Sequence, residues 1–468
     1  MKKRMYKIMA LAMTAAMVVP MAAQTTAFAA DDKEITYWNI AVESPDKDIL
    51  TAAVDKFNKE TKSGYTVNQV AIQNDTYKEK LVIAMSSGEC PDMYSSWSGG
   101  PMYEYIDSGF AQPIDDLLDQ SDIKDKLLDA AIEQGSYNGH VYAIPYLNVS
   151  LAGIFYNKDM FKQYGLEEPK TLADLENICA TLKENGITPF ALANASKWTG
   201  SMYFMSLAAR YGGLEPFQNA VAGTGKFTDD CFIKAGEKIQ EWVKNGYFPD
   251  GVNSLSEDDG QAKQLMYQET AGMLLCGSWY TGTFQTDSEE FYQKIGWFPF
   301  PAIDGSDADP TIQIGTVGDQ FISFNCEGDK LAAAFECAAD HLSDEATDIT
   351  YSSGKIVPVK DAKDHIKDPI VKEIFDAAQE ASSIQLWYDQ YLPTSVATAH
   401  LDGLQEVFGL TKTPQEAQEE MQKAMDEYLS TKSDSGAADD TAEEATDDAA
   451  ADDTAEEATD DAAADDAE

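Results

Sequence analysis

The chain has 468 residues, of which 81 are acidic and 34 are basic, so its formal net charge is −47 at neutral pH. A charge of this sign and size repels phosphate backbones and anionic lipid surfaces, which argues against nucleic acid and membrane surfaces as partners. The length is too great for a single hydrophobic core and favours more than one lobe.

Residues 1–29 have the pattern of a cleavable secretory signal. Four basic residues are followed by an apolar run from Ile8 to Val19, and the small-residue triplet Ala27-Phe28-Ala29 comes next. The run has 12 residues, which is well short of the roughly 20 that span a bilayer. The first cysteine is Cys90, so no lipobox cysteine stands at the predicted cleavage point. We expect an exported, extracytoplasmic protein that is periplasmic, secreted or held at the cell surface.

Between residues 30 and 433, short strand-like runs alternate with helical patterns, which is typical of an α/β fold. The expected strands and helices include Glu34–Ile40, Thr66–Ile72, Leu151–Tyr156, Asp46–Thr61 and Phe335–Leu342. Thr171 and Asp174 have the spacing of a capping box at the start of another helix. The stretch Thr413–Leu429 has a one-sided apolar face that should pack on a lobe.

Three tryptophans follow strand-like runs and small residues. Trp97 follows Asp92–Ser96, Trp198 comes shortly after the run that ends at Asn194, and Trp279 follows an apolar run that ends at Cys276. In open α/β sheets the ligand crevice lies beyond the carboxyl ends of the strands. An indole there offers a flat apolar face to the C–H face of a sugar ring, so the pattern predicts a sugar-stacking cleft.

Polar residues near other predicted strand ends complete the candidate site. Glu43 follows the first strand, Asn148 precedes another, and Asp319 lies in a glycine-punctuated turn where the backbone can approach a ligand closely. Trp387 and Asp389 are further candidates from a Trp-Tyr-Asp segment. By contrast, the local patterns around Trp242 and Trp297 favour packing in the core or on a lobe surface.

No catalytic, metal or cofactor motif emerges from the sequence. The four histidines lie outside any hydrolase or metalloprotease frame, and no nucleotide-binding P-loop is present. Asp304–Asp309 resembles a calcium loop, but the glycine required at the sixth place of such a loop and the closing glutamate at its twelfth place are missing. None of the six cysteines has metal-ligand spacing, and their disulfide state stays open. We therefore expect no enzyme activity, no metal and no cofactor.

Residues 434–468 carry sixteen acidic and no basic residues, and a 13-residue segment of alanine, threonine, aspartate and glutamate repeats there. The repeat contains no aromatic or branched aliphatic residue, so it cannot bury enough apolar surface to offset its ordering entropy. We expect a disordered acidic tail.

The body resembles extracellular solute-binding protein family 1, the sugar-binding components of ABC importers that are similar to maltose-binding protein. The resemblance rests on the order and spacing of six segments, which are Ile35–Trp38, Ala84–Asp92, Tyr142–Tyr146, Ile154–Phe161, Gly277–Trp279 and Phe298–Ala302. It implies a periplasmic-binding-protein type II fold, with two α/β lobes, a hinge and a cleft between the lobes. Lobe 1 would comprise residues 30–146 and 311–350, and lobe 2 residues 147–310 and 351–433.

The resemblance also implies what the cleft does. A hinge would close the lobes over a ligand contacted by Glu43, Trp97, Asn148, Trp198, Trp279, Asp319, Trp387 and Asp389. The sequence thus predicts a monomeric, non-enzymatic receptor that captures a carbohydrate, and specifically an oligosaccharide, and delivers it to the permease subunits of an ABC transporter. Two alternatives remain open, a receptor for a non-sugar solute such as a polyamine or peptide, and a secreted glycoside hydrolase.

Overall fold

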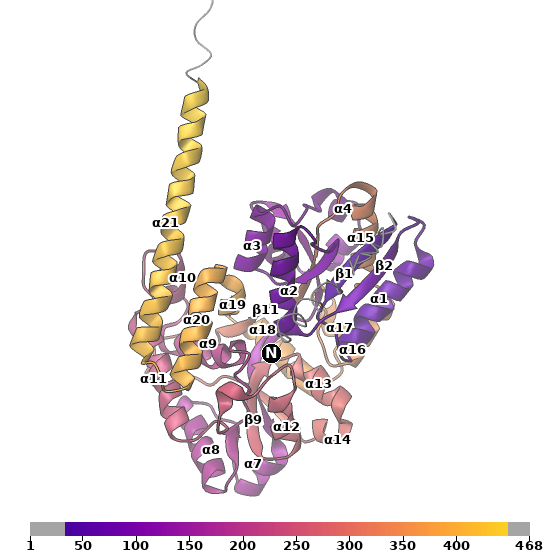
Figure 1. Ribbon diagram of the computed structural model, residues 1–468. Helices are drawn as coiled ribbons and strands as arrows, with labels where there is room; N and C mark the ends of the chain where they lie inside the picture. Colours follow the sequence, from indigo (N-terminus) through magenta and orange to yellow (C-terminus); the bar gives the residue numbers. More distant parts are fainter. Residues whose placement is uncertain (1–32, 448–468) are drawn as a thin grey trace, which may run out of the picture.

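The computed structural model describes residues 33–447, with side chains described to residue 432. The predicted secretory signal and residues 448–468 of the acidic tail lie outside this range. Within it, two α/β lobes stand side by side, and a long C-terminal helix rises from one of them (Figure 1). No helix in the described range is long and apolar enough to cross a membrane.

The first lobe is built on a five-stranded sheet. In spatial order its strands are β2 (Thr66–Ala71), β1 (Glu34–Asn39), β3 (Met93–Ser96), β12 (Gln320–Phe324) and β6 (Ala143–Leu147). The pairs β1–β2 and β1–β3 are parallel, whereas β12 runs antiparallel to both of its neighbours. The carboxyl ends of β1 and β3 therefore meet at one edge of the sheet, which faces the second lobe.

Helices and one hairpin surround this sheet. The helices are α1 (Asp46–Glu60), α2 (Asn74–Ser87), α3 (Gly100–Asp107), α4 (Asp115–Asp119), α5 (Ile123–Lys126), α6 (Asp129–Gln134), α15 (Gly328–Asp340) and α16 (Asp344–Ser352). In α1 the buried residues recur at helical spacing, from Ile49 and Leu50 to Val54 and Phe57, and they form the face that packs on the core. The hairpin joins β4 (Ser136–Tyr137) to β5 (His140–Val141) through Asn138 and Gly139, which both have positive φ.

The second lobe is built on the other large sheet. Its strands follow the order β13 (Ile384–Gln385), β11 (Gln313–Thr316), β7 (Ser150–Asn157), β9 (Ala271–Gly277) and β8 (Thr188–Phe190), and β10 (Ile295–Pro299) also pairs with β7. All eight residues of β7 are buried, as expected for a strand covered on both faces.

Most of the remaining helices belong to the second lobe, where some pack on the sheet and others on neighbouring helices. They are α7 (Lys158–Tyr164), α8 (Leu172–Glu184), α9 (Trp198–Gly212), α10 (Glu215–Val221), α11 (Asp230–Lys244), η1 (Val252–Ser254), α12 (Gln261–Tyr267), α13 (Tyr280–Asp287), α14 (Glu289–Tyr292), α18 (Pro369–Glu380), α19 (Tyr388–Tyr391), α20 (Thr394–Phe408) and α21 (Pro414–Asp447). The predicted capping box of α8 is confirmed, because Thr171 and Asp174 exchange side-chain to backbone hydrogen bonds. Arg210 in α9 is buried and donates to the carbonyls of Phe300 and Ile312, which ties the helix to the loop before β11.

The predicted strands and helices match the observed ones closely. Expected strands Glu34–Ile40, Thr66–Ile72 and Leu151–Tyr156 correspond to β1, β2 and β7, and the expected helix Asp46–Thr61 corresponds to α1. Trp242 and Trp297 are buried in the core, as predicted. The six cysteines are unpaired, and all except Cys90 are buried.

The lobe boundaries differ from the predicted ones. Strand β11 belongs to the second sheet and β12 to the first, so the chain crosses between lobes at residues 317–319 and not at residue 311. Residues 358–360 pair with residues 126–128 of the first lobe, and α18 packs on β10. The last crossing thus lies between residues 360 and 369, where α17 (Ala362–His365) is found, and not at residue 350. Lobe membership depends on the pairing partner of a segment, which its local sequence does not specify.

Helix α21 packs against α20 and α11 and then continues past residue 433, where the tail was expected to begin. Residues 434–447 are helical, which differs from the expected disorder. Alanine has the highest helix propensity and glutamate a favourable one, so an alanine-rich acidic segment can extend a helix that is already formed. The disorder of residues 448–468 stays a prediction.

Candidate ligand-binding cleft

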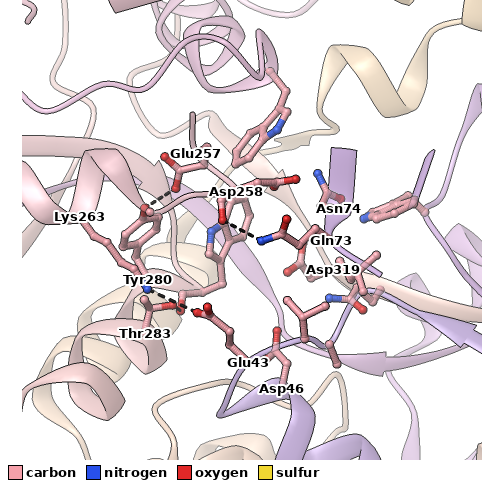
Figure 2. Close-up of a pocket in the computed structure, with 18 of the residues that line it drawn as sticks. Glu43, Asp46, Gln73, Asn74, Glu257, Asp258, Lys263, Tyr280, Thr283 and Asp319 are labelled. Atoms are coloured by element: carbon pink, nitrogen blue, oxygen red, sulfur yellow. Dashed lines mark hydrogen bonds and ion pairs between the residues drawn. The ribbon is translucent and has the colours of Figure 1, made fainter. Parts of the chain in front are cut away.

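A cavity of about 460 Å³ lies between the two lobes. Loops at the carboxyl ends of β1, β3 and β9 line it, together with the start of α2 and the segments around residues 257–263, 319–320 and 387–390. Figure 2 labels ten of the lining residues, including Gln73, Asp258 and Asp319. This volume falls within the roughly 300–1,000 Å³ that small-molecule sites occupy. The crevice is therefore where the strand-end argument predicts it, beyond the carboxyl ends of the strands.

Three indoles of the second lobe form a continuous aromatic wall. Trp279 follows β9, Trp198 begins α9, and Trp387 precedes α19. The ring centroids of Trp198 and Trp279 are 6.0 Å apart, and those of Trp279 and Trp387 are 5.9 Å apart. Trp198 and Trp279 are partly exposed to the cavity, whereas Trp387 is 2% exposed and its indole N–H has no partner among the described residues.

Gly277 explains the position of the middle indole. A Cβ built at Gly277 would lie 2.0 Å from the Trp279 ring, so only glycine lets this indole fold back over the end of β9. The Gly-Ser-Trp sequence thus encodes the orientation of the ring and not only its presence.

The first lobe contributes one indole and several polar groups. Trp97 follows β3 and makes an edge-to-face contact with Tyr77, at 6.0 Å between centroids. The ammonium of Lys78 lies 5.0 Å from the centroid of the Trp97 ring. Four polar residues of the first lobe also line the cavity, namely Glu43, Asp46, Gln73 and Asn74 (Figure 2).

The two lobes touch each other across the cleft. The indole N–H of Trp198 donates to Asp75 at 3.3 Å, and Gln73 donates to the carbonyl of Asp258 at 3.1 Å. At the outer edge, Glu104 of α3 accepts hydrogen bonds from the amide and hydroxyl of Thr394 on α20, at 2.9 and 2.6 Å. These direct contacts between facing lobes describe a closed arrangement.

Each lysine of the cavity wall is already ion-paired. Lys78 pairs with Asp389 across the cleft at 3.6 Å. Lys263 pairs with Asp287 at 2.9 Å and with Glu43 at 3.7 Å. Lys355 is nearly fully buried and pairs with Asp46.

Asp319 lies at the crossing between β11 and β12, on the floor of the cavity. It is 8% exposed, and its backbone N–H donates to the carbonyls of Leu147 and Asn148 at 2.7 and 2.8 Å. Its carboxylate has no hydrogen-bond or ion-pair partner among the described residues. Burial raises the pKa of Asp319 to about 7.

Glu257 is a second, half-buried carboxyl group of the wall. It accepts a hydrogen bond from the hydroxyl of Tyr280 (Figure 2). Burial is the main cause that raises the pKa of Glu257 to about 7, while the Tyr280 hydrogen bond acts in the opposite direction. Burial also raises the pKa of the neighbouring Asp258.

The candidate residues from the sequence are brought together with one exception. Those that line the cavity are Glu43, Trp97, Trp198, Trp279, Asp319, Trp387 and Asp389. Asn148 does not line it. Its side chain is buried at the crossing between β6 and β7, where its Oδ1 accepts the amide of Ile356 at 3.0 Å. Asn148 thus ties the crossing segment between β6 and β7 to Ile356, which lies before the last crossing.

Sequence reasoning missed most of the charged residues of the wall. The missed residues include Asp46, Lys78, Glu257, Asp258, Asp259, Lys263 and Lys355. The acidic run from Glu257 to Asp259 before Gly260 was a usable signal for a loop near the site. The lysines gave no such signal, because their partners lie far away in the chain.

The described residues contain no group of three or more histidine, cysteine, aspartate or glutamate side chains that could hold a metal ion. Two of the histidines, His341 and His400, are buried in the lobes, where burial lowers their pKa to about 4 and about 3. Neither lines the cavity. The arrangement of the wall is one of stacking surfaces and hydrogen-bonding groups, which suits reversible binding.

A family model described as a bacterial extracellular solute-binding protein matches residues 41–339. An uncharacterized ABC transporter extracellular-binding protein of Pyrococcus horikoshii is 29% identical over 288 residues, which cover 60% of this chain and 64% of that protein. A multiple sugar-binding protein of Streptococcus mutans is 27% identical over 302 residues, covering 59% of this chain and 68% of its own length. The chain thus spans less than two thirds of the Pyrococcus relative.

Solved structures share the fold over most of the chain. A protein from a study of xylan utilization by the thermophilic bacterium Caldanaerobius polysaccharolyticus has 28% identity and a TM-score of 0.76, covering 83% of this chain and 99% of that chain. A chitin oligosaccharide binding protein has 24% identity and the same TM-score of 0.76, over 84% of this chain and 98% of its own. The second likeness concerns the fold alone.

Proposed function

Because the chain belongs to the bacterial extracellular solute-binding protein family, we propose that its interlobe cavity captures a carbohydrate, and specifically an oligosaccharide, for an ABC transporter. The observation that carries the proposal is the aromatic wall formed by Trp198, Trp279 and Trp387, which faces the polar wall of the first lobe. Sugars have apolar C–H faces that stack on indoles and hydroxyls that need carboxylate and amide partners.

The extent of the wall supports an oligosaccharide. Trp198 and Trp279 are both partly exposed and their ring centroids are 6.0 Å apart, so they offer stacking surface beyond a single position, and the buried Trp387 supports Trp279 by an edge-to-face contact. The relatives add support, since one is named a multiple sugar-binding protein and one similar structure comes from work on xylan utilization.

The proposal includes export and delivery to a permease. The basic and apolar pattern of residues 1–29 would direct the protein out of the cytoplasm. The chain carries no nucleotide-binding loop, so the energy for transport would come from other subunits of the transporter. A closed, ligand-bound form would be the one that those subunits accept, because only closure brings both walls onto the ligand.

The test is titration calorimetry of the purified protein against a panel of mono- and oligosaccharides. We expect reversible binding of at least one oligosaccharide with a dissociation constant around micromolar. This corresponds to a binding free energy on the order of 8 kcal/mol. Recovered oligosaccharides should be uncut, because a receptor returns its ligand intact. No binding across the panel would contradict the proposal, and cleavage of the oligosaccharide would favour a hydrolase instead.

A further inference from the structure

The charges on the cavity wall do not balance. Seven carboxylates line the cavity, against three lysines and no arginine or histidine. Three of the carboxylates are the ion-pair partners of the lysines, namely Glu43, Asp46 and Asp389. The remaining four, Glu257, Asp258, Asp259 and Asp319, have no basic partner within 4 Å among the described residues.

The paired lysines restrict the ligand. A saccharide with a carboxylate or phosphate group would need a cation from the wall, and Lys78, Lys263 and Lys355 are each engaged with an acidic residue. Binding such a ligand would require one of these pairs to break, because the wall offers no other cation. An anionic glycan is therefore disfavoured.

The unpaired carboxylates differ in how much they need a partner. Asp259 is exposed to solvent. Asp258 accepts a hydrogen bond from the backbone amide of Asp75 at 3.1 Å, and Glu257 accepts one from the hydroxyl of Tyr280. Only the carboxylate of Asp319 is both more than nine-tenths buried and without any partner in the described part of the chain. A buried polar group without a partner carries a desolvation cost that a bound ligand can relieve.

We propose that the saccharide bound in this cleft carries a protonated amine, and that the carboxylate of Asp319 receives this amine. The inference rests on the proposed function and narrows its substrate class to amino sugars or oligosaccharides that contain them. An ammonium group completes a charge-assisted pair with a buried carboxylate, whereas a sugar hydroxyl gives only a neutral donor. The indoles would stack on the sugar rings, so both walls contribute to the same ligand.

Proton release gives a signature of this contact. Asp319 is faced by Lys355 and Lys78, which favour its ionised form, and by Asp46, which disfavours it. With a pKa of about 7, Asp319 is largely protonated in the unliganded protein at pH 6.5. An arriving ammonium favours the carboxylate, so binding should release a proton to the buffer. A neutral sugar brings no cation to Asp319, and its hydroxyls can hydrogen-bond to either form of the carboxyl group, so its binding should release fewer protons.

The experiment compares matched saccharides by calorimetry at pH 6.5 in buffers of different ionisation enthalpy. The oligosaccharide probes are the β-1,4-linked tetramers of glucosamine, N-acetylglucosamine and glucose. The monosaccharide probes are two matched pairs, glucosamine with glucose and galactosamine with galactose. Spermidine serves as an amine without a sugar ring. We expect an amine-bearing saccharide to bind at least about tenfold more tightly than its hydroxyl counterpart. Its binding should also release a fraction of a proton, as seen in the dependence of the heat on the buffer.

Two variants localise the effect. Asp319→Asn should lose both the preference for the amine and the proton release, whereas Asp304→Asn, at an exposed turn away from the cavity, should keep both. Proton release by the unmodified protein keeps the test decisive even if Asp319→Asn fails to fold.

Each other outcome overturns the inference in a distinct way. If a neutral saccharide binds as tightly as its amine partner, the amine is not recognised and the proposed sugar-receptor function stands. If spermidine binds as tightly as the best amine-bearing saccharide, the sugar rings contribute nothing and the proposed function falls as well. If no saccharide binds, both fail together.

Discussion

The two walls of the cleft are built differently. The second lobe presents three adjacent indoles, of which Trp387 is almost fully buried and belongs to the lobe core as much as to the cavity. The first lobe presents one partly exposed indole, Trp97, among carboxylate, amide and ammonium groups. We infer that the indoles of the second lobe contribute affinity by stacking on the ligand. The polar groups of the first lobe, with Asp319 at the floor of the cavity, would orient the ligand by hydrogen bonds.

The largest expected effect is on stability, and it tests whether Trp387 is part of the core of the second lobe. Trp387→Ala should lower the free energy of unfolding by about 3–5 kcal/mol, because a large buried ring leaves a cavity when removed. Trp97→Ala should cost clearly less, since Trp97 is partly exposed. Urea unfolding of both variants measures the difference, and Trp387→Phe should recover part of the loss. Equal losses for the two alanine variants would contradict the distinction between the walls.

The next effect concerns ligand affinity. Trp279→Ala should weaken saccharide binding by about 1–3 kcal/mol while the protein stays folded, because the central indole loses its stacking contact. Calorimetry against the best saccharide of the panel measures the loss. Trp242→Phe, in the core of the same lobe and away from the cavity, is the matched control and should leave affinity nearly unchanged. An unaltered affinity in folded Trp279→Ala would remove this indole from the site.

The buried carboxyl group of Asp319 should make the free energy of unfolding depend on pH. Burial raises the pKa of Asp319 from 3.8 to about 7, so the folded protein holds a proton there that the unfolded chain has already lost. The contribution of Asp319 to stability therefore falls as pH rises from about 4 to 7 and stays constant above. The free energy of unfolding of Asp319→Asn minus that of the unmodified protein should rise by about 1–3 kcal/mol between pH 5 and pH 8. A difference that does not change with pH would contradict the burial of this carboxylate.

The smallest effect tests the contact that joins the walls. Asp75→Ala removes the acceptor of the Trp198 indole N–H, and it should weaken closure and saccharide affinity by about 0.5–1.5 kcal/mol. Asp75→Asn keeps a side-chain oxygen acceptor and should recover most of the loss. X-ray scattering of the variants with saturating ligand should show no change in the closed form, only a higher ligand concentration needed to reach it. An effect larger than that of Trp279→Ala would mean that the contact between lobes, and not stacking, contributes most to affinity.

The sequence predicted the aromatic wall well and the charged wall poorly, for a physical reason. Trp97 directly follows strand β3, Trp279 comes two residues after the end of β9, and Trp198 begins the helix after β8, so local patterns place them near carboxyl strand ends. The pairs Lys78–Asp389 and Lys263–Glu43 join residues that are far apart in the chain and lie on opposite lobes. Such pairs depend on how the lobes face each other, which no local pattern encodes.

Asn148 and the lobe boundaries show the same limit. The sequence favoured Asn148 for ligand contact because it is polar and precedes a strand, yet its side chain accepts a hydrogen bond from the amide of Ile356, more than 200 positions away. The boundary near residue 311 was displaced because β11 pairs with β7 and β13 in the second lobe. Strand type was predictable from composition, whereas strand partners were not.

The most direct test of the central claim is a crystal structure of the protein with the tightest-binding saccharide of the panel. We expect sugar rings to stack on the indoles of Trp198 and Trp279, with polar groups of the ligand directed to Asp319 and to the first lobe. A saccharide bound elsewhere, with the space between the lobes left to solvent, would contradict the account.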